Sequence, residues 1–143
     1  MIRKLTSTNY TAKTVSIALL VLRVGVATLM LNHGYDKFTH FNEYKNDFMN
    51  FLGLGMRGSL ALVIFAELFC SAMILIGLFT SLFTIPLIIT MGVALFMAHG
   101  GAIFEKGELA TLYLIVYVGI LIVGPGRYSF DAVIAERINN KLA

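Results

Sequence analysis

Residues 59–80 read SLALVIFAELFCSAMILIGLFT, and Glu67 is the single charged residue among them. An α-helix needs roughly 20 mostly apolar residues to cross about 30 Å of hydrocarbon, so this stretch predicts a membrane-spanning helix. Three further apolar runs of similar length lie at about residues 14–34, 83–99 and 108–124. The sequence therefore predicts an all-α fold, a four-helix transmembrane bundle built from these four runs.

The composition of the chain agrees with a membrane protein. Of 143 residues, 58% are hydrophobic and 13% are charged, and the mean hydropathy is +0.83. A soluble domain of this size needs a far more polar surface, which excludes most soluble enzymes and makes a nucleic-acid partner unexpected. A single cysteine, Cys70, excludes an intrachain disulfide. We treat residues 1–143 as one domain whose surroundings are the lipid bilayer.

The connection between the first two runs is long and carries aromatic residues at steps of three and four. These are Phe38, Phe41, Tyr44, Phe48 and Phe51. With polar residues between them, they predict a short amphipathic helix in the membrane interface between helices 1 and 2. The alternative is that the same aromatic side chains cap the bundle.

Basic residues near the predicted helix ends indicate an orientation. The side of the two termini has six, and the opposite side has four: Arg3, Lys4, Lys13, Arg127, Arg137 and Lys141, against Lys37, Lys45, Arg57 and Lys106. Loops that carry more Lys and Arg stay in the cytoplasm. We therefore expect a multi-pass protein of the cell (inner) membrane with both termini cytoplasmic. Residues 132–142 predict a further short helix that rests on the membrane.

Two charges fall deep inside the predicted spans, Arg23 and Glu67. A charge at a helix centre costs about 2.5 to 3.5 kcal/mol on insertion scales, so each needs a partner. Counted from the outer ends of two antiparallel helices, both lie at similar depth, and a direct ion pair between them is predicted. Such a pair either fixes the helices architecturally or belongs to a functional site, and the residues alone leave both open.

Other polar residues gather toward the same outer half of the bundle. Helical spacing places Arg23, Gly34 and Lys37 on one stripe and predicts a polar channel running outward from Arg23. The ligand or proton-relay candidates are Arg23, His33, Lys37, Glu67, His99 and Glu108. Such a cluster suits a quinone head group or proton transfer. The duller explanations are interfacial histidines and a carboxylate at a helix N-terminus.

Other chemistry has little support in the sequence. No short metal-ligand motif occurs, so no metal site is expected, and no residue is assigned a catalytic role. No organic cofactor motif is evident, and a quinone is the one cofactor that the polar cluster suggests. Tyr113 and Tyr117, four residues apart, are interpreted as packing or lipid-facing side chains.

Two further patterns predict structure rather than chemistry. Thr90, Ala94 and Ala98 recur at four-residue spacing and predict a close contact with a neighbouring helix. After the fourth run, a turn is predicted whose structural residues are Gly124, Pro125, Gly126, Arg127 and Asp131. An ion pair between Arg127 and Asp131 is expected to stabilise that turn.

Taken in order along nearly the whole chain, these elements resemble those of the DoxX family of small integral membrane proteins. The matching elements are the Arg23 helix, His33-Gly34-Tyr35-Asp36-Lys37, Glu67, Ile76-Gly77-Leu78-Phe79-Thr80, Ala94 to His99, Gly107-Glu108-Leu109-Ala110, and Gly124-Pro125-Gly126-Arg127-Tyr128-Ser129-Phe130-Asp131. One departure is Ser81, where the family often has a basic residue.

The resemblance implies a four-helix inner-membrane protein linked to respiratory or sulfur-compound oxidation, because some relatives are subunits of a thiosulfate:quinone oxidoreductase and others support thiol redox balance. We therefore expect a membrane subunit of a quinone- or thiol/sulfur-linked redox system, with a partner oxidoreductase subunit and with self-association as a further option. Whether the chain is itself an enzyme stays open. Two alternatives are a non-catalytic membrane scaffold for a partner oxidoreductase and a small proton-coupled exporter.

Overall fold

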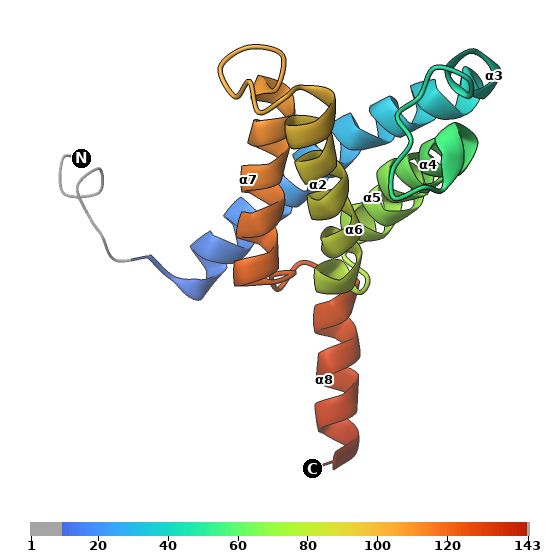
Figure 1. Ribbon diagram of the computed structural model, residues 1–143. Coiled ribbons are helices and arrows are strands. Elements are labelled where there is room, and N and C mark those ends of the chain that lie inside the picture. The colour runs from blue at the N-terminus through green and yellow to red at the C-terminus, as the bar shows by residue number, and fades with distance from the viewer. Residues whose placement is uncertain (1–9, 143) are drawn as a thin grey trace.

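The computed structural model describes residues 10–142, and within this range the chain forms helices and no strand (Figure 1). This confirms the all-α fold class. Arg3 and Lys4, which count toward the predicted orientation, lie outside the described residues. Two segments, η1 and η2, are π-helical. In chain order the elements are α2 (Ala12–Thr39), α3 (Phe41–Tyr44), α4 (Gly55–Ile64), η1 (Phe65–Cys70), α5 (Ser71–Ile76), α6 (Thr80–Val93), η2 (Ala94–Ala98), α7 (Glu108–Val123) and α8 (Phe130–Leu142).

Within residues 10–142, three continuous helices are long and apolar enough to cross a membrane. They are Ala12–Thr39 with 28 residues, Gly55–Ile76 with 22 and Thr80–Ala98 with 19. The fourth predicted span corresponds to α7, an apolar helix of 16 residues. At 1.5 Å per residue α7 is about 24 Å long, shorter than the hydrocarbon core of a typical bilayer. The described chain is therefore a helical membrane protein with three full-length spans and one shorter apolar helix.

The connection after the first span differs from the predicted amphipathic helix. The helix α2 continues to Thr39 and so includes Phe38, and the only helix that follows before Gly55 is the four-residue α3. Leu52 and Gly53 have positive φ values of 52° and 77°. Right-handed helix cannot continue through such residues. The aromatic residues that we assigned to one helix are therefore divided between α2, α3 and an irregular segment at residues 45–54.

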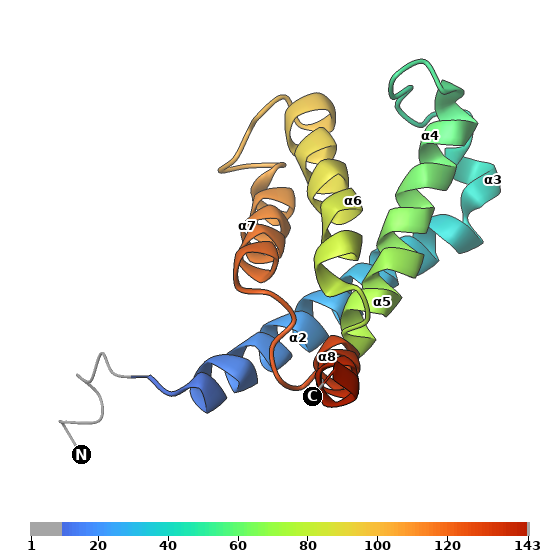
Figure 2. The ribbon, with the colours of Figure 1, turned by 90° about the horizontal axis from the view of Figure 1, so that it is seen from below.

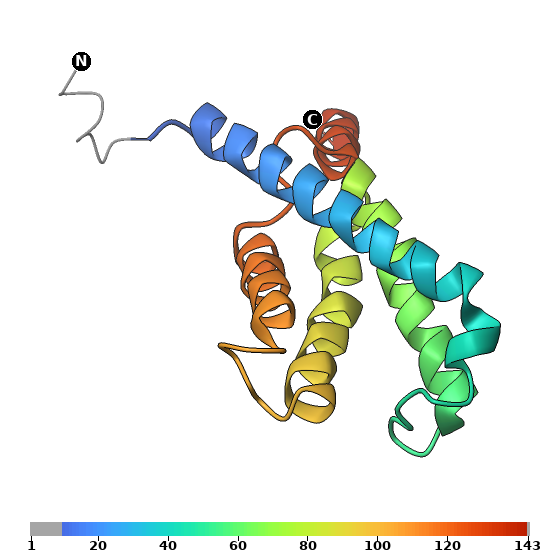
Figure 3. The same ribbon diagram turned by 90° about the horizontal axis from the view of Figure 1, so that it is seen from above.

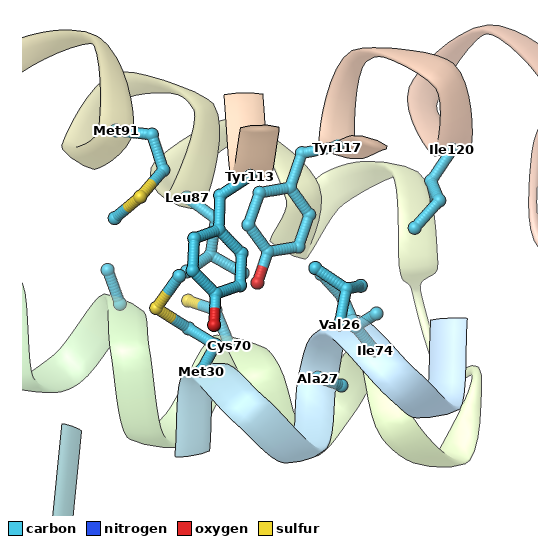
Figure 4. Packing of buried hydrophobic residues seen from close by; sticks show 11 residues of the cluster. Val26, Ala27, Met30, Cys70, Ile74, Leu87, Met91, Tyr113, Tyr117 and Ile120 are labelled. Atoms are coloured by element: carbon cyan, nitrogen blue, oxygen red, sulfur yellow. The ribbon is translucent and has the colours of Figure 1, made fainter. Parts of the chain in front are cut away.

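The core lies where α2 crosses the second span, with α6 packed against the second span and α7 packed against both α6 and α2 (Figure 3). Figure 4 shows its members pointing toward one another: Val26, Ala27, Met30, Cys70, Ile74, Leu87, Met91, Tyr113, Tyr117 and Ile120. Tyr117 is completely buried, so both tyrosines pack rather than face lipid. Lipid tails are as apolar as these side chains, so close packing, not removal from water, holds the helices together.

The second span ends and the third begins at one tight turn, and the two helices separate with distance from it. Gly77 has a left-handed φ of 76° and donates its N–H to the carbonyls of Met73 and Ile74, which ends α5. From this turn α6 leaves beside α5, and Figure 2 shows α4 and α6 diverging toward the opposite end of the molecule. The diverging helices are the walls of the site described next.

Candidate functional site

A buried ion pair joins the first and second spans. Lys37 Nζ donates to Glu67 Oε2 at 2.7 Å, and the side chain of Glu67 is 4% exposed whereas that of Lys37 is 25% exposed. Gly34, one turn before Lys37, lets the two helices touch: a Cβ atom added there would lie 2.9 Å from the Glu67 carbonyl carbon. The close approach at Gly34 therefore places Lys37 directly over Glu67.

One π-helical segment contains Glu67 of this ion pair, and the other leads to His99. Glu67 lies within η1, and His99 follows the last residue of η2. A π-helical turn accommodates one extra residue, which re-aims the side chains around it, and such turns occur frequently at functional sites. Here the two turns lie on facing helices, and both Glu67 and His99 border the same cavity.

A cavity of about 500 Å³ lies between the diverging second and third spans. Its charged or titratable lining residues are Lys37, Glu67 and His99. Three exposed apolar residues, Leu62, Phe65 and Ile89, also line it and belong to membrane-spanning helices. The other lining residues are Phe48, Met49, Phe51, Ser59, Val63, Ala66, Pro86, Thr90, Val93, Ala94 and Ala98. The cavity therefore combines a polar end with apolar walls that open sideways, where the bilayer would lie.

The irregular segment before α4 covers part of this cavity. Phe48, Met49 and Phe51 contribute lining side chains. The Phe51 N–H donates to the hydroxyl of the buried residue Ser59 at 2.8 Å, which ties the segment to the start of α4. The aromatic run thus acts at this position as a cap on the bundle, the alternative to an interfacial helix.

The small residues of the third span lie at the cavity. Thr90, Ala94 and Ala98, which were predicted to allow a close helix contact, all line it. Their short side chains leave space open on this wall. The stripe helps to form the cavity.

The predicted ion pair between Arg23 and Glu67 is wrong. Arg23 Nη1 donates to the Pro125 carbonyl at 2.6 Å and Nη2 to the Tyr128 carbonyl at 2.5 Å. Arg23 lies opposite Gly77, where an added Cβ would be 2.8 Å from its Nη1 atom. Glu67, ten residues before Gly77, is about 15 Å away along the helix.

The error in depth arises from where the helices end. The prediction counted from His33 and from residue 59, but α2 continues to Thr39 and α4 begins at Gly55. Because Gly34 lies against Glu67, the start of α4 extends well past the end of α2, and the two helix ends do not lie at the same depth. Between the two charges, α2 presents Val26, Ala27 and Met30 to the core, so the predicted polar channel is interrupted by apolar packing.

The expected ion pair between Arg127 and Asp131 is also wrong. The carboxylate of Asp131 accepts hydrogen bonds from the N–H groups of Phe79 at 2.6 Å and Thr80 at 2.9 Å, at the N-terminus of α6. A carboxylate is favoured there because the first N–H groups of a helix lack partners within it. Arg127 is exposed, and Arg23 instead holds this connection from inside.

Two of the remaining candidates do not line this cavity. His33 is half-buried and packs its ring edge-to-face on Tyr113, with 5.9 Å between the ring centroids. Glu108 is exposed and lines a separate surface hollow together with Glu105 and Lys106. The structure therefore brings together Lys37, Glu67 and His99, and places Arg23, His33 and Glu108 outside their cavity.

A family model for DoxX matches residues 18–100. The chain belongs to the DoxX family. Comparisons with the curated proteins and with the solved structures gave no match. The matched part of this DoxX chain includes all three residues of the cavity's polar end, whereas Glu108 and the Gly124–Asp131 connection lie beyond it.

The actual role of Asp131 in this DoxX chain was not predicted from the sequence, although the residue was expected to stabilise the turn. Its partners, the N–H groups of Phe79 and Thr80, are about fifty residues away in the sequence. The Asp131 N–H also donates to the Gly77 carbonyl at 2.9 Å. Three of the sequence elements that resemble the DoxX family are therefore in contact in the structure: those around Arg23, Gly77 and Asp131.

Among the described residues of the DoxX chain, no group of three or more His, Cys, Asp or Glu side chains is arranged to hold a metal ion. Two charged assemblies therefore characterise the molecule. One assembly, with Lys37, Glu67 and His99, borders a cavity. In the other, Arg23 and Asp131 form hydrogen bonds with backbone groups of the chain itself.

Proposed function

We propose that this DoxX chain is a membrane subunit of a redox system and binds a quinone-type molecule in the cavity at Glu67. The observation that carries the proposal is a buried Lys37–Glu67 ion pair at the end of an apolar cavity of about 500 Å³. Ligand pockets of this volume, mostly apolar with a few polar groups, are typical of small-molecule sites.

The polar end offers both kinds of hydrogen bond that a quinone head group uses. Lys37 donates one N–H to Glu67 and has two further donors. Glu67 Oε1 has no hydrogen-bond partner within residues 10–142, so it is available as an acceptor. His99 can donate or accept. A carbonyl of a quinone would accept from Lys37 or His99, and a hydroxyl of the reduced form would donate to Glu67. When bound, a quinone supplies two-electron, two-proton redox chemistry.

The energetics of the ion pair also favour a role beyond architecture. Desolvation of two charges often outweighs their attraction, and a well-packed apolar pair of similar volume is often equally stable or more stable. Charged residues inside membrane helices characteristically mark ligand or proton pathways. The apolar mouth formed by Leu62, Phe65 and Ile89 favours a ligand that arrives from the bilayer.

The same proposal includes location and partners. The start of α2, the α5–α6 turn and the connection to α8 lie toward one end of the molecule, and the 40–54 and 100–107 connections lie toward the other (Figure 1). The first end has Lys13, Arg127, Arg137 and Lys141. The positive-inside rule supports a cytoplasmic position for this end in the inner membrane. A partner oxidoreductase at the other end, beside the 40–54 connection that contributes Phe48, Met49 and Phe51 to the cavity, would exchange electrons with the bound quinone.

Quinone binding by the purified chain tests the proposal. The protein would be reconstituted in lipid nanodiscs, and photo-crosslinking by an azido-quinone would be measured with increasing amounts of unlabelled short-chain quinone. We expect saturable labelling of residues that line the cavity. Glu67→Gln should weaken competition about tenfold or more, because a charged hydrogen-bond acceptor contributes about 1.5 to 3 kcal/mol.

Glu108→Gln is the matched control, since Glu108 is exposed and outside the cavity. Labelling that does not saturate, or an equal effect of the two substitutions, would contradict the proposal. In a deletion strain, Glu67→Gln should also fail to restore the redox phenotype while Glu108→Gln restores it.

A scaffold function is the second candidate, because one element has an unpacked apolar face. No residue of α8 is buried, and Figure 1 shows this helix extending away from the other helices. Val133, Ile134 and Ile138 are between 39% and 53% exposed. Truncation after Tyr128 distinguishes the two functions: a scaffold would lose its co-purifying oxidoreductase, whereas quinone labelling at the Glu67 cavity would persist.

A further inference from the structure

A second hollow lies at the end of the molecule far from Glu67. It is a shallow groove of about 560 Å³ between the start of α2 and the connection from α7 to α8. Its walls include the apolar residues Val15, Leu19 and Val123. Its remaining lining residues are Tyr10, Ala12, Ser16, Pro125, Gly126, Arg127 and Ala132.

The groove crosses the boundary between apolar and polar surroundings. Val123 is the last residue of α7, and the apolar stretch of α2 begins near Val15, so these walls belong to the ends of two apolar helices. Arg127 and Tyr10 lie just beyond those ends. A molecule that fills the groove would therefore contact hydrocarbon-facing side chains at one end and a guanidinium group at the other.

Arg127 is free to bind an anion. It is exposed, and within residues 10–142 no acidic side chain lies within ion-pair distance of it. Asp131, the acidic residue of the same connection, uses both carboxylate oxygens on the N–H groups of Phe79 and Thr80. Lys13, in the first turn of α2, adds a second exposed cation at this end.

The groove is also held in shape from inside the molecule. Arg23 bonds the carbonyls of Pro125 and Tyr128, on either side of Arg127. Gly126 packs on Leu19, since an added Cβ would lie 3.4 Å from the Leu19 side chain. A site whose backbone is already fixed loses little conformational entropy when a ligand binds.

We propose that this groove binds one anionic phospholipid, with its phosphate on Arg127 and an acyl chain along Val15, Leu19 and Val123. Basic pockets between membrane helices on the cytoplasmic side are suited to anionic lipid head groups. A zwitterionic lipid carries its own cation, which does not complement Arg127 and Lys13. The site is independent of the Glu67 cavity, so the quinone proposal can fail without affecting it.

Lipid retention by the full-length protein tests this inference. The protein would be reconstituted in an equimolar mixture of phosphatidylglycerol and phosphatidylcholine and extracted in mild detergent, and bound lipids would be counted by native mass spectrometry. We expect one retained phosphatidylglycerol per chain. Arg127→Gln should lower its retention about fivefold, the effect of one basic residue near an anionic surface.

Two further variants separate the groove from general charge. Arg137→Gln removes the same charge from α8 outside the groove and should leave retention unchanged. Val123→Trp leaves the charge intact but fills the groove, and it should lower retention as Arg127→Gln does. Glycerol 3-phosphate should not displace the lipid, since it lacks the acyl chains. Equal effects of Arg127→Gln and Arg137→Gln, or no preference for phosphatidylglycerol in the wild type, would overturn the proposal.

Discussion

Substitution of Arg23 by methionine separates an architectural role from a functional one. Arg23 is 3% exposed, and its guanidinium group donates to the carbonyls of Pro125 and Tyr128 at 2.6 and 2.5 Å. Methionine fills much of the same volume but cannot donate. The substitution therefore leaves two carbonyl groups of the α7–α8 connection without the partner that holds them.

The magnitude follows from these two hydrogen bonds. A hydrogen bond to a charged group contributes about 1.5 to 3 kcal/mol net, so two give about 3 to 6 kcal/mol. Removing the buried charge recovers part of its desolvation cost, which favours the lower half of that range. We expect Arg23→Met to lower the free energy of unfolding by about 3 to 4 kcal/mol.

Reversible unfolding in mixed micelles, followed by circular dichroism, measures that change. Limited proteolysis provides a local readout, because the connection at residues 124–129 should become cleavable in the variant. Arg137→Gln is the control and should change neither quantity, since that side chain is exposed and lies on α8 outside the connection. A variant with unchanged stability that loses quinone labelling would refute this reasoning and return Arg23 to the ligand site.

The remaining predictions concern the helix contact and the outer connection. Gly34→Ala should destabilise the protein by about 1 to 3 kcal/mol, because its Cβ would lie 2.9 Å from Glu67 backbone and side-chain atoms; Gly25→Ala, with nothing within 4 Å, should be neutral or slightly stabilising in the same unfolding assay. His40 lies just after α2, where bonding to the Asp36 carbonyl and the nearby carboxylates of Glu43 and Asp36 raise its pKa above 6.5. Because the folded-state pKa is raised, His40 should stabilise the connection fully below about pH 6.5, and this contribution should fade as the pH rises through the raised value. An NMR titration of the His40 imidazole with a midpoint at or below 6.5 would contradict this.

Much of the fold could be predicted because hydropathy is a local property. The runs at 59–80 and 83–99 correspond closely to Gly55–Ile76 and Thr80–Ala98, and the helix predicted at 132–142 corresponds to α8. Boundaries were less predictable where a helix continued past its apolar residues. The polar sequence after Leu31 concealed the last five helical residues of α2, since the predicted run ended at residue 34 and the helix ends at Thr39.

The candidate site was predicted only in part. Lys37, Glu67 and His99 were among the residues singled out, and they share one cavity. Their grouping with Arg23 failed, since residue counts from helix ends do not give the register of two crossing helices. The divergence of α4 from α6, which creates the cavity, leaves no signal in either helix alone.

The sequence by itself determined that this chain is helical, lies in a membrane and buries two charged groups, because helix formation and transfer into lipid depend on residues close together in the chain. The tertiary structure decided which partner each charge has. Gly34 packs on Glu67 and Gly77 packs on Arg23, and this register sets the charges about 15 Å apart. Lys37 therefore pairs with Glu67, and Arg23 donates to the carbonyls of a connection about a hundred residues away. Contacts of that kind arise only where helices cross, and no local pattern specifies them.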